Sequence, residues 1–189
     1  IFPQPQIGGK CAQTNVNKFE WYWLVKCEII LTSHRQFFIV PNLKTKMDID
    51  SAIRLRKSVR NFQNRRVDWR TILEAIDGAI QGPFAGNNNN LRFLIVENKE
   101  SIKKISEHCE QAWIAESPLL ILVCSDDAYL EEIYGERGRV YSRQQSGAAI
   151  QTLILNLTSQ GIDSCWVGSY SDNALKKELD IPSDFQIEA

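Results

Sequence analysis

Three stretches of this 189-residue sequence carry side chains that could bind a small charged or aromatic ligand. The first contains Arg56, Ser58 and Arg60 at alternate positions, which in an extended segment places the three side chains on one side. Such a set suits a phosphate, because arginine can bind two phosphate oxygens at once and serine donates a further hydrogen bond. A solvated basic face and a nucleic-acid patch are the alternatives, since further arginines lie nearby: Arg54, Arg65, Arg66 and Arg70.

The second stretch, residues 83–90 (PFAGNNNN), combines a glycine with four asparagines. Glycine and asparagine tolerate unusual backbone angles, and amide side chains both donate and accept hydrogen bonds. These properties suit the edge of a heterocycle in which carbonyl and N–H groups alternate, although asparagine is more common in ordinary turns. The third stretch, residues 161–168 (GIDSCWVG), directly follows a long apolar segment, so its backbone amides would lie at a fixed place beside the core.

Two residues of the third stretch also have ordinary structural explanations. Trp166 alone would more often pack in a core than stack on a cofactor. Cys165 is a poor candidate for a nucleophile, because no histidine lies near it in sequence and buried thiols are usually inert. The whole chain has only two histidines, His34 and His108, so we expect neither a metal site built on imidazole nor a Ser-His-Asp triad.

Hydrophobic periodicity predicts the elements that must hold these stretches. We expect a helix from Asp48 to about Lys57, with Ile49 and Ile53 on one face, and a second helix that begins after an Asp68 cap. The second helix, which residues 82–83 (GP) end, has apolar residues at helical spacing: Trp69, Ile72, Leu73, Ile76, Ala79 and Ile80.

The remaining pattern predicts strands at 91–97 and 118–125, the latter apolar throughout and therefore covered on both faces. We also expect a surface helix at 99–110, a buried helix at 142–160 that Gly161 ends, a short strand or turn at 164–170, and a last helix capped by Ser171. Because strands and helices do not alternate regularly, an α+β domain is favoured over a doubly wound fold.

Composition narrows the classes of partner. An apolar fraction of 43% and a charged fraction of 24% fit a soluble globular protein, and a net charge of −1 gives no general reason to expect nucleic acid or a membrane as partner. No apolar run is long enough to predict a spanning helix. The five cysteines are odd in number and widely spaced, which favours a reducing cytoplasm over a disulfide scaffold.

Residues 1–46 differ from the rest, because they show an aromatic cluster but no sustained periodicity. The only methionine is Met47, and an amphipathic pattern begins directly after it. We therefore interpret 1–46 as an extension of unknown origin, either an upstream, misassigned or foreign segment, and place the folded domain at 47–189. The alternative is a genuine N-terminal arm that wraps a partner.

Taken in order, the three stretches resemble the nitroreductase family. The run RKSVRNF at 56–62 resembles the family's R-x-S-x-R-x-F opening, and GPFAGNNNNLRFLIV at 82–96 resembles its A-P-S-A-x-N-x-Q-P-W-x-F-x-V segment. The most specific match is GAAIQTLILNLTSQGIDSCWVG at 147–168, which resembles A-A-x-x-N-L-x-L-x-A-x-x-x-G-L-x-S-C-W-x-G. The resemblance covers Met47 to about Ala189.

This resemblance implies an α+β layered fold with a central mixed or antiparallel sheet flanked by helices, working as a homodimer with FMN at the subunit interface. In the implied ping-pong cycle, NAD(P)H reduces FMN and leaves, and a small-molecule acceptor such as a nitroaromatic or quinone takes its place. Two alternatives stay open: a family flavoenzyme of another type, such as a dehalogenase or dehydrogenase, and a non-catalytic anion- or RNA-binding module that uses residues 54–70.

Residue roles follow from the same resemblance. The residues around Ser58 would hold the FMN phosphate and ribityl chain, and Arg60 would lie at the pyrimidine edge, where a cation stabilises the negative charge of reduced flavin. Asn87 would hydrogen-bond the ring, and the amides at Val167 and Gly168 would approach its N5 side. The full set of implied cofactor-binding residues is Arg56, Lys57, Ser58, Arg60, Pro83, Asn87, Cys165, Trp166, Val167 and Gly168.

The sequence also departs from the family pattern. Phe84 replaces a usual serine, residues 89–91 (NNL) replace Gln-Pro-Trp, and Gln145 stands where an acidic residue is common. The chain stops at 185–189, inside a predicted strand, where the family continues with a G-Y-P segment and a basic residue that meets the phosphate. We therefore expect a C-terminally incomplete domain with weakened FMN binding.

Overall fold

Two neighbouring strands organise the core of the computed structural model, which describes residues 47–189. β1 (Leu91–Val96) and β2 (Leu120–Asp126) pair antiparallel, with Leu91 opposite Ser125. β3 (Phe185–Ile187) pairs antiparallel with the other edge of β2. The strand order among the described residues is therefore β1-β2-β3.

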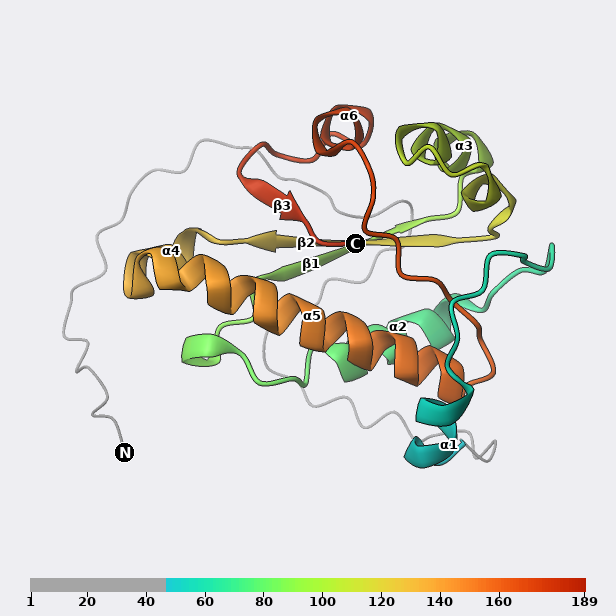
Figure 1. Cartoon of the computed structure of the whole chain (residues 1–189), viewed down its shortest axis with the longest axis horizontal. Helices are drawn as coiled ribbons and strands as arrows, with labels where there is room; N and C mark the ends of the chain where they lie inside the picture. Colours follow the sequence, from blue (N-terminus) through green and yellow to red (C-terminus); the bar gives the residue numbers. More distant parts are fainter. Residues whose placement is uncertain (1–46) are drawn as a thin grey trace. The chain divides into compact units, whose positions relative to one another are not determined.

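Side chains that alternate along these strands separate two hydrophobic clusters, one on each face of the sheet. α2 (Trp69–Ala79) and α5 (Glu136–Ser159) cover one face, whereas α3 (Lys99–His108) and α6 (Asp172–Glu178) cover the other (Figure 1). The first cluster includes Ile72, Ala75, Leu91, Val123, Ile150 and Leu153. The second includes Val96, Ile102, Ile105, Leu122, Cys124 and Leu175. The apolar strand is thus covered on both faces, as predicted.

Local capping explains where the helices begin and end. Asp48 accepts a hydrogen bond from the backbone N–H of Ser51 ahead of α1 (Ile49–Leu55), and Asp68 accepts one from Arg70 ahead of α2. α5 ends at Ser159, and Gly161, two residues later, has a left-handed φ of 75°, which prevents the helix from continuing. The predicted caps at Asp48, Asp68 and Gly161 are confirmed.

The structure differs from the sequence pattern, or adds to it, at three of these helices. The buried helix begins at Glu136 rather than 142, and a further helix, α4 (Ala128–Tyr134), precedes it. On α2, Ala75 is fully buried, whereas the predicted core residue Leu73 is 41% exposed. The apolar face of α1 is also exposed, because Ile49 and Ile53 lie outside both clusters.

Two short 3₁₀ turns complete the described fold: η1 (Ala85–Asn87) in the asparagine-rich stretch and η2 (Ala112–Glu116) after α3. The α+β layered fold predicted from the sequence is confirmed. None of the helices in the described part of the chain is both long and apolar enough to span a bilayer. The interpretation of residues 1–46 as an extension concerns residues outside the described range.

Candidate functional site

The first and third candidate stretches, residues 56–62 and 161–168, lie side by side in the structure. Ser58 forms an isolated parallel β-bridge with Ser164, and the backbone N–H of Val59 donates to the carbonyl of Ser164 over 3.1 Å. Two stretches that are far apart in sequence are therefore joined by one parallel bridge. We call residues 56–60 and 164–168 together the paired strip.

Cationic side chains belong to the first half of the paired strip. Arg56 is half-buried at the C-cap of α1, where its backbone N–H donates to Ala52 over 3.0 Å, and Lys57 and Ser58 are exposed. The backbone of Arg56 is extended, with a ψ of 122°, so the chain leaves the helix there. Three groups that can bind a phosphate are thus available on one short segment.

Arg60 is held in place by an aromatic residue that the sequence patterns missed. Its guanidinium carbon lies 5.8 Å from the centre of the Trp113 ring, and the ring of Phe62 lies 6.1 Å from the same tryptophan. A cation over an aromatic face is attracted to the ring and remains free to bind an anion on its outer side. Trp113 comes from η2, and no periodic signal links that turn to residues 56–62.

The third stretch presents an exposed aromatic ring and open backbone. Trp166 is 42% exposed, so it does not take the core position that a lone tryptophan more often takes. Cys165 is half-buried, and its thiol donates to the carbonyl of Trp166 over 3.7 Å. A Cβ added at Gly168 would meet no atom within 4 Å, so a flat ligand can approach this backbone closely.

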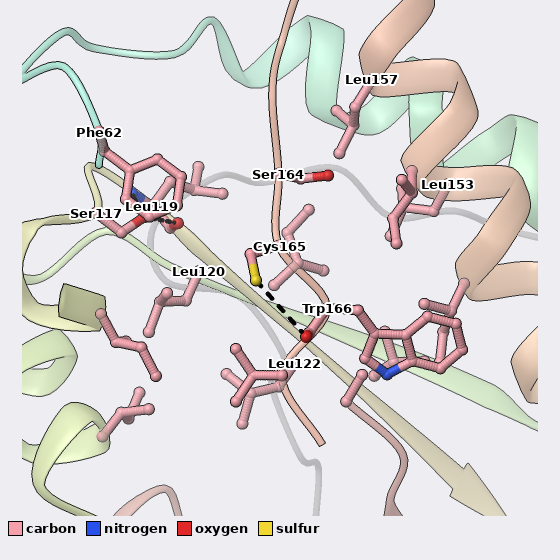
Figure 2. A pocket seen from close by; sticks show the side chains of 18 of the residues that line it. Phe62, Ser117, Leu119, Leu120, Leu122, Leu153, Leu157, Ser164, Cys165 and Trp166 are labelled. Carbon is pink, nitrogen blue, oxygen red and sulfur yellow. Dashed lines mark hydrogen bonds between the residues drawn. The ribbon is translucent and has the colours of Figure 1, made fainter. Parts of the chain in front are cut away.

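Behind the paired strip lies an apolar cavity of about 180 Å³, between β2, α5 and residues 162–167 (Figure 2). Residues that line it include Phe62, Leu119, Leu122, Leu153, Leu157 and Cys165. The four cationic and hydroxyl residues at 56–60 that suit a phosphate are not among its lining residues. The cavity is therefore lined by the third stretch, through Cys165, Trp166 and Val167, and by none of the residues that suit a phosphate.

The asparagine-rich stretch contacts the first half of α5. The backbone N–H of Ala85 donates to Oε1 of Gln145 over 3.0 Å, whereas Met47, which precedes α1, donates to Ser159 at the helix end (Figure 1). Gln145 and Ser159 are separated by about 21 Å along the axis at about 1.5 Å per residue. Pro83 and Asn87 are exposed there, and Asn87 has a φ of 54°, which asparagine tolerates better than most residues.

A buried polar network supports this end of the molecule. Arg143 on α5 pairs with Asp127 over 2.5 Å and with Glu188 over 2.9 Å, and Ser125 donates to Glu188 over 2.6 Å. Burial raises the pKa of Glu188, although the hydrogen bond from Ser125 and the charge of Arg143 act in the opposite direction. This network ties β2 and the segment after β3 to α5.

Other reactive groups lie away from the strip. Burial raises the pKa of Cys124 to about 11, so this thiol is protonated at neutral pH. Within residues 47–189, no three side chains of histidine, cysteine, aspartate or glutamate gather closely enough to hold a metal ion. The described residues therefore offer cations, a hydroxyl and open backbone, the groups from which a site for an anionic, flat ligand could be built.

Comparisons with known proteins agree with this description. The family model described as "Nitroreductase family" matches residues 53–118 and 108–189. A protein of Methanothermobacter thermautotrophicus, named as a candidate NADH dehydrogenase or NAD(P)H nitroreductase, is 35% identical over 127 residues, which cover 67% of this chain. The match spans 63% of that relative's length.

Two further proteins are similar over most of the described domain. The iodotyrosine deiodinase of Thermotoga neapolitana is 26% identical over 153 residues, covering 70% of this chain and 80% of its own. A solved structure titled as an FMN-dependent nitroreductase from Clostridium difficile has a TM-score of 0.63 and 19% identity, and the match covers 72% of this chain and 81% of that one. With the family model matched over most of residues 53–189, this chain belongs to the nitroreductase family.

Proposed function

We propose that this chain is an FMN-dependent oxidoreductase in which NAD(P)H is the electron donor and a nitroaromatic or quinone is the acceptor. The observation that carries the proposal is the pairing of Ser58 with Ser164, which joins cationic side chains to the open backbone at Gly168. A ligand that combines a phosphate group with a planar ring system needs both the cationic side chains and the open backbone. The names of two similar proteins, an NAD(P)H nitroreductase and an FMN-dependent nitroreductase, support the same cofactor and donor.

The chain's own residues fit FMN along the outer side of the strip. Arg56, Lys57 and Ser58 would hold the phosphate and ribityl chain, since two cations and a hydroxyl offset its charge. Arg60, resting on Trp113, would lie at the pyrimidine edge of the ring, where its positive charge favours the reduced cofactor. When bound, FMN takes a hydride from NAD(P)H and supplies two electrons to the acceptor.

The third stretch would define the face at which donor and acceptor bind in turn. The backbone amides at Val167 and Gly168 would approach the N5 side of the ring, because Gly168 has no side chain to keep a ligand away. Cys165 and the exposed ring of Trp166 would border the same face. These residues position the flavin and limit access of water, while the bond-making chemistry belongs to the cofactor.

The distance along α5 supports a site built from two copies of this chain. Ala85 contacts Gln145 and Met47 contacts Ser159, two positions of α5 that are about 21 Å apart at about 1.5 Å per residue, so the asparagine-rich stretch and the start of α1 contact separate parts of the helix. A two-fold partner whose α5 runs in the opposite direction would bring its Asn87 to the strip. A two-fold contact of this kind uses the same surface on both chains.

Exposed apolar side chains lie at both ends of α5, where such a partner would contact the chain. On α1, Ile49, Ile53 and Leu55 are 63%, 55% and 57% exposed. At the other end, Ile133 on α4 and Val140 on α5 are 47% and 42% exposed. Apolar surface of this kind favours association, because burying it removes it from water. The cytoplasm remains the proposed location, since Cys109, Cys124 and Cys165 are free thiols.

The proposal is tested by the visible absorption spectrum of the purified chain with and without added FMN. We expect a flavin spectrum that is perturbed by the protein, release of FMN on denaturation, and bleaching when NADH or NADPH is added without oxygen. The proposal would be refuted by a colourless protein whose fluorescence and thermal stability do not change when FMN is added.

Replacing Ile53 by aspartate is expected to weaken self-association at least about tenfold, because a charge would have to be buried in an apolar contact. The measurement is sedimentation equilibrium, with FMN affinity determined in parallel. Ala112→Asp adds the same charge on η2, at the other face of the sheet, and should leave self-association unchanged. Equal behaviour of the two variants would contradict a two-copy site that includes α1.

Reductive dehalogenation is a second candidate, favoured by the similarity to an iodotyrosine deiodinase. In that reaction two electrons and a proton replace a carbon–iodine bond by a carbon–hydrogen bond, and iodide leaves. Turnover with iodotyrosine, set against turnover with a nitroaromatic and a quinone under the same donor, distinguishes the two functions. Iodide release at a rate that exceeds the other two would favour the dehalogenase.

A further inference from the structure

Gln145 holds both ends of the asparagine-rich loop through three hydrogen bonds. Its Oε1 accepts from the backbone N–H of Ala85 over 3.0 Å, and its Nε2 donates to the carbonyl of Asn88 over 3.3 Å and to Oδ1 of Asn90 over 2.6 Å. Gln145 is 5% exposed and Asn90 is 4% exposed, so water does not replace these partners easily.

Further hydrogen bonds fix which way each amide points. Asn90 donates from Nδ2 to the carbonyl of Asp126 over 2.9 Å and to the hydroxyl of Ser142 over 2.8 Å. The Ser142 hydroxyl donates to the carboxylate of Asp127 over 2.6 Å, so it must accept from Asn90. The oxygen of Asn90 therefore faces Gln145, and position 145 must donate to Asn90 while it accepts from Ala85.

The loop between these anchors presents Asn87 to solvent. Gly86 and Asn87 have φ values of 60° and 54°, and short turns close the loop, in which Asn87 donates to Phe84 over 3.0 Å and Asn88 to Ala85 over 3.1 Å. Asn87 is a non-glycine residue in the left-handed region, and such a conformation persists only when the surrounding structure fixes the loop. Gln145 supplies this restraint from a rigid helix.

We propose that Gln145 is a positioning residue that fixes the loop at 85–90, so that Asn87 is presented in a binding-competent conformation to the flavin held by the partner copy. This inference rests on the proposed function, because it assigns Asn87 to the flavin site. Gln145 itself would not touch the flavin. Its amide is required because only a neutral amide both accepts from Ala85 and donates to Asn88 and Asn90.

A glutamate at position 145 tests this requirement with almost no change in shape. The ionised carboxylate accepts from Ala85 but faces two acceptor oxygens, whereas the protonated acid can donate to one of them. Burial beside acceptors favours the protonated form. The surrounding elements also carry charged and titratable groups, all of which the unaltered chain shares. They are Arg92 on β1, Asp126 at the end of β2, Asp127 after it, Tyr129 and Tyr134 on α4, Arg143 on α5 and Glu188 after β3.

The experiment measures the FMN dissociation constant of the full chain and of Gln145→Glu between pH 5.5 and pH 8.5. At high pH, Gln145→Glu should bind FMN at least about tenfold more weakly than the unaltered chain, and the ratio should return toward one as pH falls. Gln145→Leu, which loses all three hydrogen bonds, should be weakened at every pH. Gln144→Glu makes the same charge change at the exposed neighbouring position and should match the unaltered chain.

Hydrogen exchange without FMN separates this inference from the proposed function. Relative to the unaltered chain at the same pH, the amides of 85–90 should exchange faster in Gln145→Glu at high pH only, and those of Gln144→Glu should not change. If FMN binds no variant but this exchange pattern holds, the flavin role fails and with it the assignment of Asn87. If exchange of the loop is unaltered in Gln145→Glu, or if FMN affinity falls equally at all pH values, the inference is overturned.

Discussion

A chain in which Arg56 and Arg60 are both replaced by alanine is expected to bind FMN at least about 100-fold more weakly than the unaltered chain. Charge-assisted hydrogen bonds contribute about 1.5–3 kcal/mol each, and about 1.4 kcal/mol corresponds to a tenfold change in affinity. Arg56 belongs to the set that faces the phosphate in the proposal, whereas Arg60 rests on Trp113 and acts at the ring. Quenching of flavin fluorescence in a titration measures the loss.

The matched control is the double variant Arg65→Ala and Arg66→Ala, which removes the same charge from two exposed residues outside the paired strip. Its FMN affinity should change by less than about threefold, because exposed charges at a distance are screened by solvent and salt. An equal loss in both double variants would mean that the basic segment attracts anions without a built site. Binding of RNA with a steep salt dependence would then be the function to test.

The two arginines should also differ from each other when tested singly. Arg56→Ala should weaken the binding of oxidised and reduced FMN to a similar extent, because the phosphate keeps its charge in both states. Arg60→Ala should weaken the binding of reduced FMN more, which lowers the reduction potential of the bound flavin. The same shift of potential in both variants would contradict the separate roles assigned to them.

Replacing Gly138 by alanine is expected to lower the free energy of unfolding by about 3 kcal/mol, which is a large share of the stability of a small domain. A Cβ at Gly138 would lie 2.2 Å from the carbonyl oxygen and 2.3 Å from the carbonyl carbon of Leu130. Both are backbone atoms of α4, so no side chain can move aside. α4 would have to shift relative to α5, which contacts it closely just after the turn at Gly135.

At Gly147, on the same helix, replacement by alanine is expected to change the free energy of unfolding in the opposite direction. A Cβ there would meet no atom within 4 Å, so alanine should raise the free energy of unfolding by about 0.5–1 kcal/mol through its better helix propensity. Urea unfolding followed by circular dichroism measures both variants. If Gly138→Ala were as stable as Gly147→Ala, the close approach of α4 and α5 would be wrong.

Elements that depend on local interactions were predictable from the sequence. The caps at Asp48 and Asp68 and the helix end at Gly161 each involve hydrogen bonds within a few residues, so the residue types alone reveal them. The strands β1 and β2 were predictable for a related reason, because their apolar residues are contiguous. The family resemblance likewise rests on short motifs that can be read in the sequence.

Contacts between distant segments were not predictable in this way. Nothing in the residue types indicates that Ser58 pairs with Ser164, that Trp113 lies against Arg60, or that the ring of Trp166 is exposed. Burial of an apolar side chain depends on which surfaces meet it, and hydrophobic attraction has no direction that a sequence pattern could record. α4 was missed although it has the same length as α1 and α6, which were predicted; its N-cap residue, Asp127, makes no side-chain capping hydrogen bond.

The sequence by itself determined the kinds of group available to this protein. They are a basic segment, an asparagine-rich loop and the segment 161–168, which has a glycine at each end and follows a buried helix. Only the tertiary structure decided how they are distributed: the basic segment is paired with residues 164–168, and the loop is held by the first half of α5. The reason is physical. Side-chain chemistry is local to each residue, whereas the separation of two groups depends on the length and packing of the helix between them.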